Sequence, residues 1–345
     1  MSAKKGNPSI KDVARVAGVS FKTVSRVLNR DPGVSGGLRA RVERAVREVG
    51  YVANAGARAM RSGKSGVVGF ISDVIATTPH SYEIVKGVQD GLAKRGFSML
   101  IANTENDPAR EAGQLSMFLE NRVEGVIYAS MYHREVTAPD LPAEVGLVML
   151  NCFDSLSRYP AVVPDDEQIG RLAAEHLISI GHRKIAYMTL VKDIVATPLR
   201  AKGFRDAAKA AGIPATDARM RESVRRNARG EEISRAADMV KALFASADPP
   251  TAILAGNDPE AMRIVAALHR LKLRIPGDVS VLGIDDYRLI CERLDPPLSS
   301  IGLPYREMGV RAVERLFGAD PGAELVERMP GPLAVRESTA PPLRP

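Results

Sequence analysis

Hydrophobic and polar positions divide the chain into two stretches with different periods. Between residues 8 and 50, apolar residues recur at helical spacing in three short runs, which predicts three short helices. From Gly66 onward, apolar runs of strand length alternate with longer stretches of helical period. The sequence therefore predicts a small helical head followed by a larger α/β body.

The three predicted helices of the head are separated by sharp breaks. Ser9 is placed to cap the first helix, and Gly18 interrupts the apolar pattern after it. Ser20 is placed to cap a second helix that runs to about Leu28, and Ser35 is placed to cap the third. Two short helices joined by a turn that contains glycine are typical of a helix-turn-helix, which we expect within residues 8–50.

The body alternates strands with helices over its whole length, which implies parallel sheets wound in βαβ units. The predicted strands are 67–71, 98–102, 126–129, 147–150, 184–189, 251–255, 279–283 and 298–302. The predicted helices are 82–95, 109–121, 170–180, 199–211, 230–244, 260–271 and 305–316. So many strands exceed one sheet of ordinary size, so the fold class is α/β with two doubly wound lobes.

Charge separates the head from the body. Residues 1–64 contain 14 Lys and Arg and 4 Asp and Glu, a net charge of +10. The whole chain of 345 residues carries +7, so the other residues together carry −3. A strongly basic head on a slightly acidic body favours a polyanionic partner such as double-stranded DNA, although a solvated basic surface is the alternative.

The chain shows no sign of export or of a membrane span. Its polar, basic first residues are not followed by an apolar segment, and no uncharged apolar stretch reaches membrane-spanning length. We therefore expect a cytoplasmic protein in which the two cysteines, Cys152 and Cys291, are reduced core residues.

Motifs of cofactor chemistry and catalysis are missing. The run Gly63-Lys64-Ser65 ends like a phosphate-binding loop, but Arg58 stands where the motif needs a glycine. There is no dinucleotide fingerprint, nucleophile elbow or paired-cysteine metal site, and His182 lies in a helix-to-strand turn that favours a structural role. We expect no cofactor, no metal and no enzymatic activity.

The second helix of the head carries the candidate DNA contacts. In a helix-turn-helix, the first residues of the second helix reach base edges in the major groove. Lys22 and Arg26 can donate to guanine, and Phe21 can pack on a thymine methyl group. Small polar side chains suit phosphate contacts. The remaining expected contacts of the head are Ser9, Ser20, Thr23, Ser25 and Asn29.

Polar side chains follow the predicted strands of the body. Ligands of open α/β sheets bind beyond the carboxyl ends of the strands. Amide and carboxylate groups there suit a polyhydroxylated ligand, although Asp and Asn are also common turn residues. The candidate effector ligands at strand ends are Asp73, Asn103, Asn151, Asn257 with Asp258, and Asp285 with Asp286.

The head and the segment after it resemble the lactose repressor (LacI/GalR) family. The resemblance lies in SIKDVARVAGVSFKTVSRVLNRDPGVS and in LRARVERAVREVGYVAN. It implies that residues 51–65 form a hinge that orders when two subunits meet on DNA. Met60 would enter the minor groove, Ala57 would let the paired hinge helices approach, and Arg58 and Asn54 would contact DNA. A flexible linker without a DNA role is the alternative.

The resemblance continues through NTENDPARE, EHLISIGHRKIAYM, RAKGFRDA, GNDPEAM and IPGDVSVLGIDDY. It implies a sensor like a periplasmic sugar-binding protein over residues 66–345, with lobe 1 about 66–163 plus 296–330 and lobe 2 about 164–295. The main effector contacts of the family fall on Arg200, Asn257 and Asp285. Other effector positions carry departures from the family pattern, at Asn151, His80, Ser81 and Leu303.

Together these features predict a dimeric repressor that binds a palindromic operator under the control of a sugar-like effector. The tail after residue 335 is short and rich in proline, which favours a dimer over a larger assembly. A cluster of Arg200, Arg225, Arg226 and His80 would favour an acidic sugar, but Arg225 and Arg226 also read as solvated residues. A ligand-binding protein with an incidental basic head and a sugar-modifying enzyme are the alternative functions.

Overall fold

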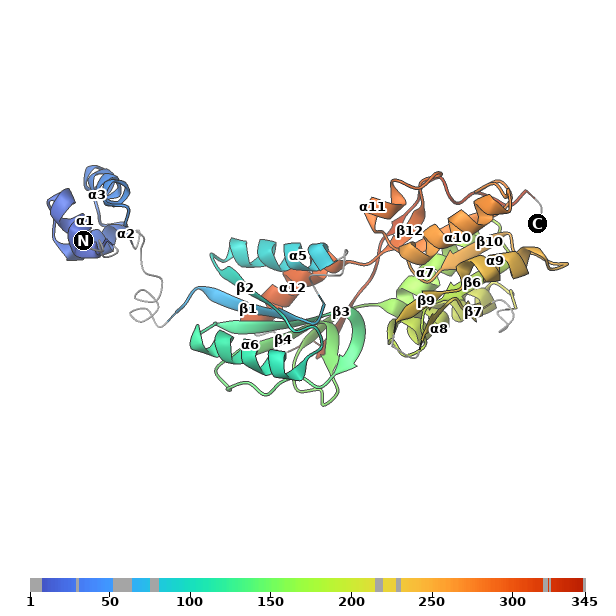
Figure 1. Ribbon diagram of the computed structural model, residues 1–345, viewed down its shortest axis with the longest axis horizontal. Coiled ribbons are helices and arrows are strands. Elements are labelled where there is room, and N and C mark those ends of the chain that lie inside the picture. The colour runs from blue at the N-terminus through green and yellow to red at the C-terminus, as the bar shows by residue number, and fades with distance from the viewer. Residues whose placement is uncertain are drawn as a thin grey trace, which may run out of the picture. The chain divides into compact units, whose positions relative to one another are not determined.

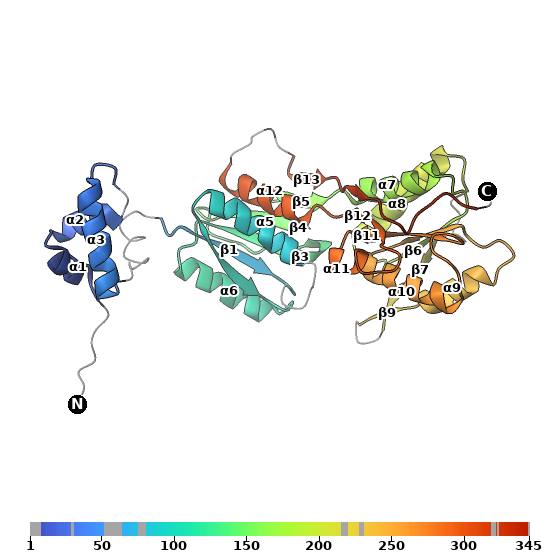
Figure 2. The same ribbon diagram turned by 90° about the horizontal axis from the view of Figure 1, so that it is seen from above.

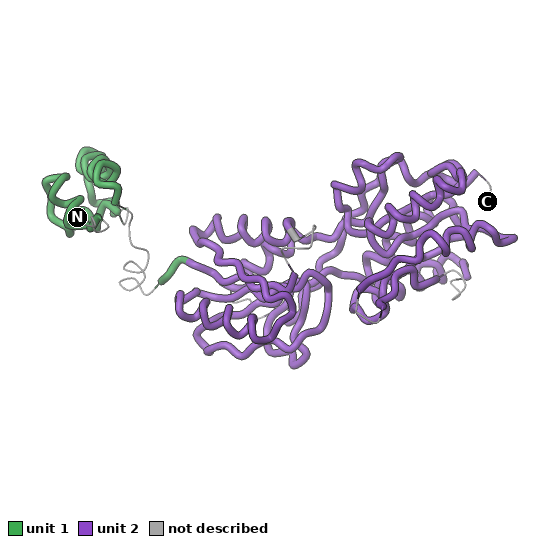
Figure 3. Tube along the Cα trace, in the orientation of Figure 1, with its two compact units in different colours: residues 1–66 green, residues 67–345 purple. Residues whose placement is uncertain are grey.

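The computed structural model describes residues 8–28, 31–51, 64–74, 81–214, 220–227, 231–318, 322 and 324–343. The chain forms two compact units, residues 1–66 and residues 67–345 (Figure 3). We refer to them as the head and the body.

The head is a bundle of three helices, as predicted. The helices are α1 (Ile10–Ala17), α2 (Phe21–Leu28) and α3 (Gly36–Val49). One apolar face of each helix meets in a small core that includes the fully buried Val13, Val24 and Val42. Gly18 ends α1 with a φ of 61°, a left-handed conformation that suits glycine and turns the chain toward α2.

The first sheet of the body has the strand order β13-β5-β4-β3-β1-β2, with every neighbouring pair parallel. Its strands are β1 (Val67–Ser72), β2 (Ser98–Asn103), β3 (Gly125–Val136), β4 (Gly146–Asp154), β5 (Ala161–Pro164) and β13 (Val326–Met329). Its helices are α5 (Ser81–Lys94), α6 (Pro108–Glu120) and α12 (Tyr305–Phe317).

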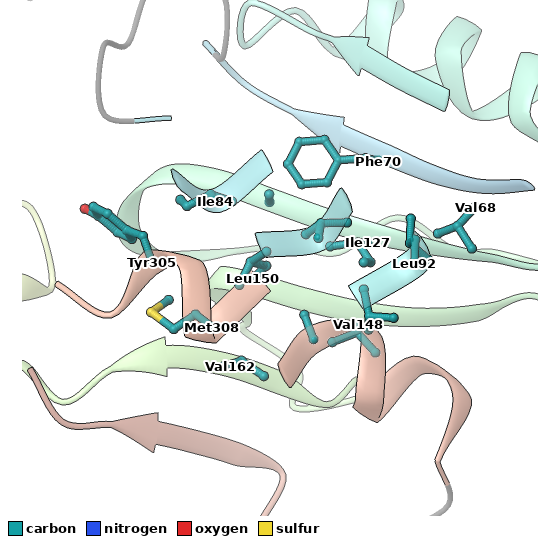
Figure 4. Packing of buried hydrophobic residues seen from close by; sticks show 14 of the residues in the cluster. Val68, Phe70, Ile84, Leu92, Ile127, Val148, Leu150, Val162, Tyr305 and Met308 are labelled. Atoms are coloured by element: carbon teal, nitrogen blue, oxygen red, sulfur yellow. The ribbon is translucent and has the colours of Figure 1, made fainter. Parts of the chain in front are cut away.

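Helices cover both faces of this sheet, since α5 and α12 lie on one side and α6 on the other (Figures 1 and 2). Alternate side chains of one strand therefore enter different cores. Phe70 of β1 packs with Ile84 and Met308 from α5 and α12 (Figure 4), whereas Ile71 packs with Phe118 of α6. Burial on both faces explains why these strands read as continuous apolar runs.

The second sheet has the order β14-β12-β11-β10-β6-β7 and is parallel except for β14. Its strands are β6 (Ile185–Thr189), β7 (Met220–Glu222), β10 (Ala252–Ala255), β11 (Ser280–Asp285), β12 (Ser299–Gly302) and β14 (Leu333–Ala334). A separate hairpin pairs β8 (Val224–Arg226) with β9 (Glu232–Ser234). The helices are α7 (Asp166–Ser179), α8 (Ala196–Ala210), α9 (Ala236–Phe244), α10 (Asp258–Arg270) and α11 (Arg288–Cys291).

This second sheet is also covered on both faces. Residues of α7 and α8 pack on one face, in a core that includes Ile169 and Phe204. Residues of α9 and α10 pack on the other, in a core that includes Val240 and Ile264. The body therefore consists of two doubly wound lobes, lobe 1 around the first sheet and lobe 2 around the second.

The chain passes between the lobes three times, after β5, after β12 and between β13 and β14. Because β12 pairs with β11, residues Ser299–Gly302 belong to lobe 2. The assignment of residues 296–330 to lobe 1 was therefore wrong at its start. The composition and apolar pattern of a strand such as β12 do not reveal which of the two sheets it joins.

All eight strands predicted for the body are present, but short strands were missed. Six strands of two to four residues were not predicted: β5, β7, β8, β9, β13 and β14. The helix predicted over 230–244 begins only at Ala236, because Glu232–Ser234 forms β9. The two cysteines are buried and free, as predicted. Within the described ranges, no helix is long and apolar enough to cross a membrane.

Candidate functional site: a recognition helix and an inter-lobe cavity

Helix α2 presents a polar face and one large exposed ring. Val24 and Val27 are buried in the head, so the opposite side of the helix faces solvent. On that side Phe21 is 62% exposed, and Lys22 is also exposed. The N-terminus of α2 is fixed by Ser20, whose hydroxyl accepts a hydrogen bond from the backbone N–H of Thr23 at 3.1 Å.

Arg26 of α2 is held by an acidic residue of the following loop. Its Nε donates to an oxygen of Asp31 at 2.7 Å, and the other oxygen of Asp31 accepts from the backbone N–H of Gly33. The hydrogen bond from Arg26, followed by that from Gly33, lowers the pKa of Asp31. The guanidinium therefore has a defined orientation on the exposed face of the helix.

Some of the other DNA-contact candidates lie at the start of α1 or within α2, and the others lie outside the described residues. The hydroxyl of Ser9 donates to Asp12 at 2.7 Å, so this serine stabilises the start of α1. Ser25 is partly buried on α2. Asn29 and the hinge candidates lie outside the described residues; the hinge candidates are Asn54, Ala57, Arg58 and Met60.

A cavity of about 50 Å³ lies between the two lobes of the body, beyond the carboxyl ends of the strands. Lobe 1 contributes Met131, Tyr132, His133, Asn151, Pro164 and Tyr305. Lobe 2 contributes Leu190, Ile194, Ala196, Arg200, Asn257 and Asp285, and Leu303 lies in the passage between the lobes. The predicted effector positions Asn151, Arg200, Asn257, Asp285 and Leu303 are thus brought to one place.

Lobe 1 reaches this cavity through a large bulge in β3. The register pairs Ala129 with Leu150 and Arg134 with Cys152, so four residues of β3 stand opposite a single residue, Asn151. Asn151 has a φ of 57°, and its Nδ2 donates to the carbonyl oxygen of Ser130. A bulge redirects side chains relative to a regular strand.

Asp73 holds this bulge in place from the end of β1. One of its oxygens accepts from the hydroxyl of Ser130 at 2.8 Å, and the other accepts from the backbone N–H of Met131 at 3.0 Å. Arg134 adds an ion pair at 3.0 Å. Asp73 is buried and does not line the cavity, so this geometry does not support its prediction as an effector ligand.

Three buried charged or titratable side chains meet at the cavity. Arg200 of α8 donates through Nε to Asp166 at 2.7 Å and through Nη1 to the carbonyl oxygen of Gly256 at 3.0 Å. The second oxygen of Asp166 lies 2.6 Å from Nδ1 of His133. Burial alone would raise the pKa of Asp166, but Arg200 and His133 outweigh it and lower that pKa. Asp166 therefore remains a carboxylate.

Close packing of α7 on α8 brings Arg200 to Asp166. A Cβ at Gly170 would lie 2.0 Å from the carbonyl oxygen of Arg200, and a Cβ at Gly203 would lie 1.9 Å from that of Glu167. Any side chain at these positions would force the helices apart. The two glycines thus permit the approach on which the buried ion pair depends.

Asn257 and Asp285 complete the cavity from lobe 2. The side-chain oxygen of Asn257 caps α10 by accepting from the N–H of Glu260, which leaves its amide nitrogen for the cavity. Asp285 has a φ of 121°, a conformation that non-glycine residues rarely adopt. Strained backbone of this kind often marks functional positions. Asp258, by contrast, is fully buried behind the cavity and accepts from Ser300 and Tyr287.

Three further effector candidates are Asn103, Ser81 and His80. Asn103 ends β2 and is not among the lining residues, Ser81 begins α5, and His80 lies outside the described residues. Arg225 and Arg226 are exposed on β8 and form ion pairs with acidic neighbours instead. Arg225 and Arg226 therefore do not join Arg200 in the lining of the cavity.

Sequence reasoning missed His133 and Asp166. The apolar pattern predicts a strand that ends at Ala129, whereas β3 continues to Val136. A run of Tyr, His and Arg directly after a buried strand is a signal that could have drawn attention to this segment. The partner of His133 lies 33 residues away, which no local pattern reveals.

A helix-turn-helix head and a two-lobed body with a polar cavity define the class of DNA-binding regulators that carry a ligand sensor. Comparisons with known proteins make the assignment specific. A family model described as "Bacterial regulatory proteins, lacI family" matches residues 9–54, and one described as "Periplasmic binding protein-like domain" matches residues 174–339. The chain belongs to the LacI family of transcription regulators.

Relatives match over nearly the whole length. The sucrose operon repressor of Escherichia coli is 32% identical over 337 residues, which cover 96% of this chain and 99% of the relative. The ribose operon repressor of Escherichia coli K12 is 33% identical over 319 residues, 90% of this chain and 92% of the relative. The structure of the Lac repressor dimer bound to operator and the anti-inducer ONPF matches with a TM-score of 0.74 and 25% identity, over 97% of this chain and 100% of that one.

Proposed function

We propose that this regulator represses transcription by binding a palindromic operator as a homodimer, and that a carbohydrate or related polyhydroxylated metabolite controls its DNA binding from the inter-lobe cavity. The names of the sucrose and ribose operon repressors support the effector class, and the operator-bound Lac repressor dimer supports the assembly. The protein acts in the cytoplasm, where the operator is, and performs no catalysis.

The observation that carries the effector site is the convergence of polar side chains from both lobes. Asn151 comes from lobe 1, whereas Arg200, Asn257 and Asp285 come from lobe 2. Amide, guanidinium and carboxylate groups can each bind hydroxyl groups, which both donate and accept hydrogen bonds. Apolar and aromatic neighbours such as Leu190 and Tyr305 offer surface for the carbon faces of a sugar.

The size of the cavity supports a sensor whose lobes rearrange. Small-molecule sites usually measure about 300–1,000 Å³, whereas this cavity holds about 50 Å³. A second hollow of about 560 Å³ shares Asp285, Leu303 and Tyr305 with it. Binding therefore requires the lobes or the lining side chains to move, and a ligand that favours one arrangement shifts the population toward it.

The DNA contacts are assigned to the exposed face of α2. Phe21, Lys22 and Arg26 stand on its solvent side, where they can reach base edges once the helix enters the major groove. Thr23 and Ser25 lie beside them and are proposed to contact phosphates. The basic charge of residues 1–64 supplies affinity that does not depend on sequence.

A DNA-binding titration tests this assignment. An operator duplex is first selected from genomic fragments with the full chain, and binding is then followed by fluorescence anisotropy. Arg26→Ala should weaken operator binding about 10-fold or more and relax base preference at one position. Arg44→Ala is the matched control, because it removes the same charge from an exposed position of α3. Equal affinities for the parent and Arg26→Ala would reject α2 as the recognition helix.

A further inference from the structure

Two residues that line the inter-lobe cavity each have a buried side-chain atom without a hydrogen-bond partner within the described ranges. The two atoms are Nε2 of His133 and Oδ1 of Asn151. The side chains are almost fully enclosed, with exposures of 7% for His133 and 1% for Asn151. A buried polar atom without a partner is costly unless a bound molecule satisfies it.

The surrounding hydrogen bonds determine what each atom offers. Asn151 donates through Nδ2 to the carbonyl oxygen of Ser130, so the atom left toward the cavity is the amide oxygen, an acceptor. Asp166 is a carboxylate and can only accept, so Nδ1 of His133 carries the proton in their 2.6 Å contact. With that proton on Nδ1, the tautomer leaves Nε2 as an acceptor.

The charges around the cavity point in the same direction. Asp166 balances the guanidinium of Arg200 in a direct ion pair. Asp285 adds a further carboxylate to the lining, and Arg225 and Arg226 are engaged elsewhere. An acidic ligand would therefore bring its carboxylate toward acceptor atoms and the carboxylates of Asp166 and Asp285, whereas hydroxyl or ammonium groups would supply the donors that the two atoms lack.

We propose that His133 and Asn151 are specificity residues that accept hydrogen bonds from hydroxyl groups of the effector, so that the site takes uncharged or amino sugars and discriminates against sugar acids. This inference rests on the proposed function, because it concerns the effector of the same cavity. His133 is set in its orientation by Asp166 of the other lobe, so the acceptor is in place before the ligand arrives.

The test is a binding screen of the full chain with matched sugars. The probes are galactose, galactosamine and galacturonate; glucose, glucosamine and glucuronate; ribose and ribonate; and sucrose. Thermal shift identifies a ligand and isothermal titration calorimetry measures its affinity. We expect an uncharged or amino sugar to bind at least about 10-fold more tightly than its acid counterpart, as the loss of one or two hydrogen bonds to buried groups implies.

Variants of His133 and Asn151 test whether these side chains bind the sugar. Asn can donate to Asp166 as Nδ1 of His133 does but lacks the second nitrogen, so His133→Asn should weaken binding of the identified sugar about 10-fold. Asn151→Gly tolerates the positive φ and should have a similar effect. His269→Asn is the matched control, since His269 is exposed near the end of α10 and does not line the cavity. Far-UV circular dichroism and melting temperature establish that each variant is folded.

Deoxy analogues of the identified sugar separate recognition from a structural role. The analogue that lacks the hydroxyl group bound by His133 should bind the parent protein about 10-fold more weakly than the full sugar does. It should bind His133→Asn with the same affinity as the full sugar binds that variant. Tighter binding of the acid form, or equal affinity of the parent and His133→Asn, would overturn this inference and leave the carbohydrate sensor intact. A screen in which no sugar, amino sugar or sugar acid binds would instead remove the proposed effector class itself, and this inference with it.

Discussion

The head and the inter-lobe cavity hold their polar side chains in opposite ways. On α2, the candidate contacts are exposed and their partners are close in sequence, as in the pairs Ser20–Thr23 and Arg26–Asp31. In the cavity, His133 and Arg200 are buried, and their contacts to Asp166 span 33 and 34 residues. The contacts that shape a DNA-binding surface can form between residues close in sequence, whereas a cavity that selects one small molecule requires the completed fold.

This contrast predicts different costs for similar substitutions. Loss of a contact in the cavity should reduce the stability of the body, since the abandoned partner stays buried. Loss of a contact on α2 should cost no more than about 1 kcal/mol of stability and should reduce DNA affinity. The following predictions test the contrast, beginning with the largest expected effect.

Arg200→Leu should lower the free energy of unfolding by about 3–5 kcal/mol, because it leaves the carboxylate of Asp166 buried without its cation. Urea unfolding of the full chain followed by circular dichroism measures the loss. Arg171→Leu provides the control, since it breaks an exposed pair with Glu167 that contributes at most about 1 kcal/mol. Comparable losses for the two variants would contradict the distinction between buried and exposed pairs.

Asp73→Ala should cost about 2–3 kcal/mol, because the hydroxyl of Ser130 and the N–H of Met131 lose their common acceptor. It should also weaken sugar binding, since the bulge that positions His133 would relax. Asp107→Ala, which removes an exposed N-cap from α6, should cost about 1 kcal/mol and leave sugar binding unchanged. Intact sugar affinity in a folded Asp73→Ala protein would mean that Asp73 does not hold the bulge.

Asp258 should make stability depend on pH. Burial, followed by the nearby charge of Asp285, raises the pKa of Asp258 to about 8. Between its ordinary pKa of 3.8 and about 8, the folded state keeps a proton that the unfolded state has released. Rising pH therefore favours unfolding through this window, and stability should fall as pH increases.

Asp258→Asn should flatten that slope, which urea unfolding at pH 5, 6, 7 and 8 would show. Asp278→Asn is the control with the opposite shift, because a hydrogen bond from Arg274 lowers the pKa of Asp278 to about 2. The stability that Asp278 contributes is lost only as pH falls toward that value, so its variant should keep the parent slope between pH 5 and 8. An unchanged slope in Asp258→Asn would refute the assignment.

The smallest effect is expected in the head. Ser20→Ala removes the hydroxyl that caps α2 and should cost about 1 kcal/mol. Ser35→Ala is the comparison, because the side chain of Ser35 forms no capping hydrogen bond at the start of α3 and its loss should be close to neutral. Native-state hydrogen exchange of the α2 amides resolves the difference, and equal protection in the two variants would contradict it.

The sequence predicted the architecture well because the spacing of apolar residues and the distribution of charge can be read from short stretches of the chain. Three helices in the head and eight strands of the body were recognised from apolar spacing alone. The cavity was recognised only in part. Arg200, Asn257, Asn151 and Asp285 were placed by resemblance and by their position after strands, and they do line one cavity.

What the sequence did not reveal depends on register and on contacts between lobes. Asp73 looks like any acidic residue after a strand, yet the bulge beside it makes it an internal acceptor. His133 acquires its position from the same bulge, in which β3 has four residues opposite Asn151. Which of the two sheets a strand joins, such as the sheet of lobe 2 for β12, is likewise a property of the whole fold.

The central claim is that a ligand in the inter-lobe cavity controls DNA binding, and reciprocal titration tests it most directly. Operator affinity is measured by anisotropy with and without a saturating amount of the sugar found in the screen, and sugar affinity is measured with and without operator. The account predicts that each ligand changes the affinity of the other by the same factor, about 5-fold or more. An operator affinity that stays the same when the cavity is saturated would contradict it.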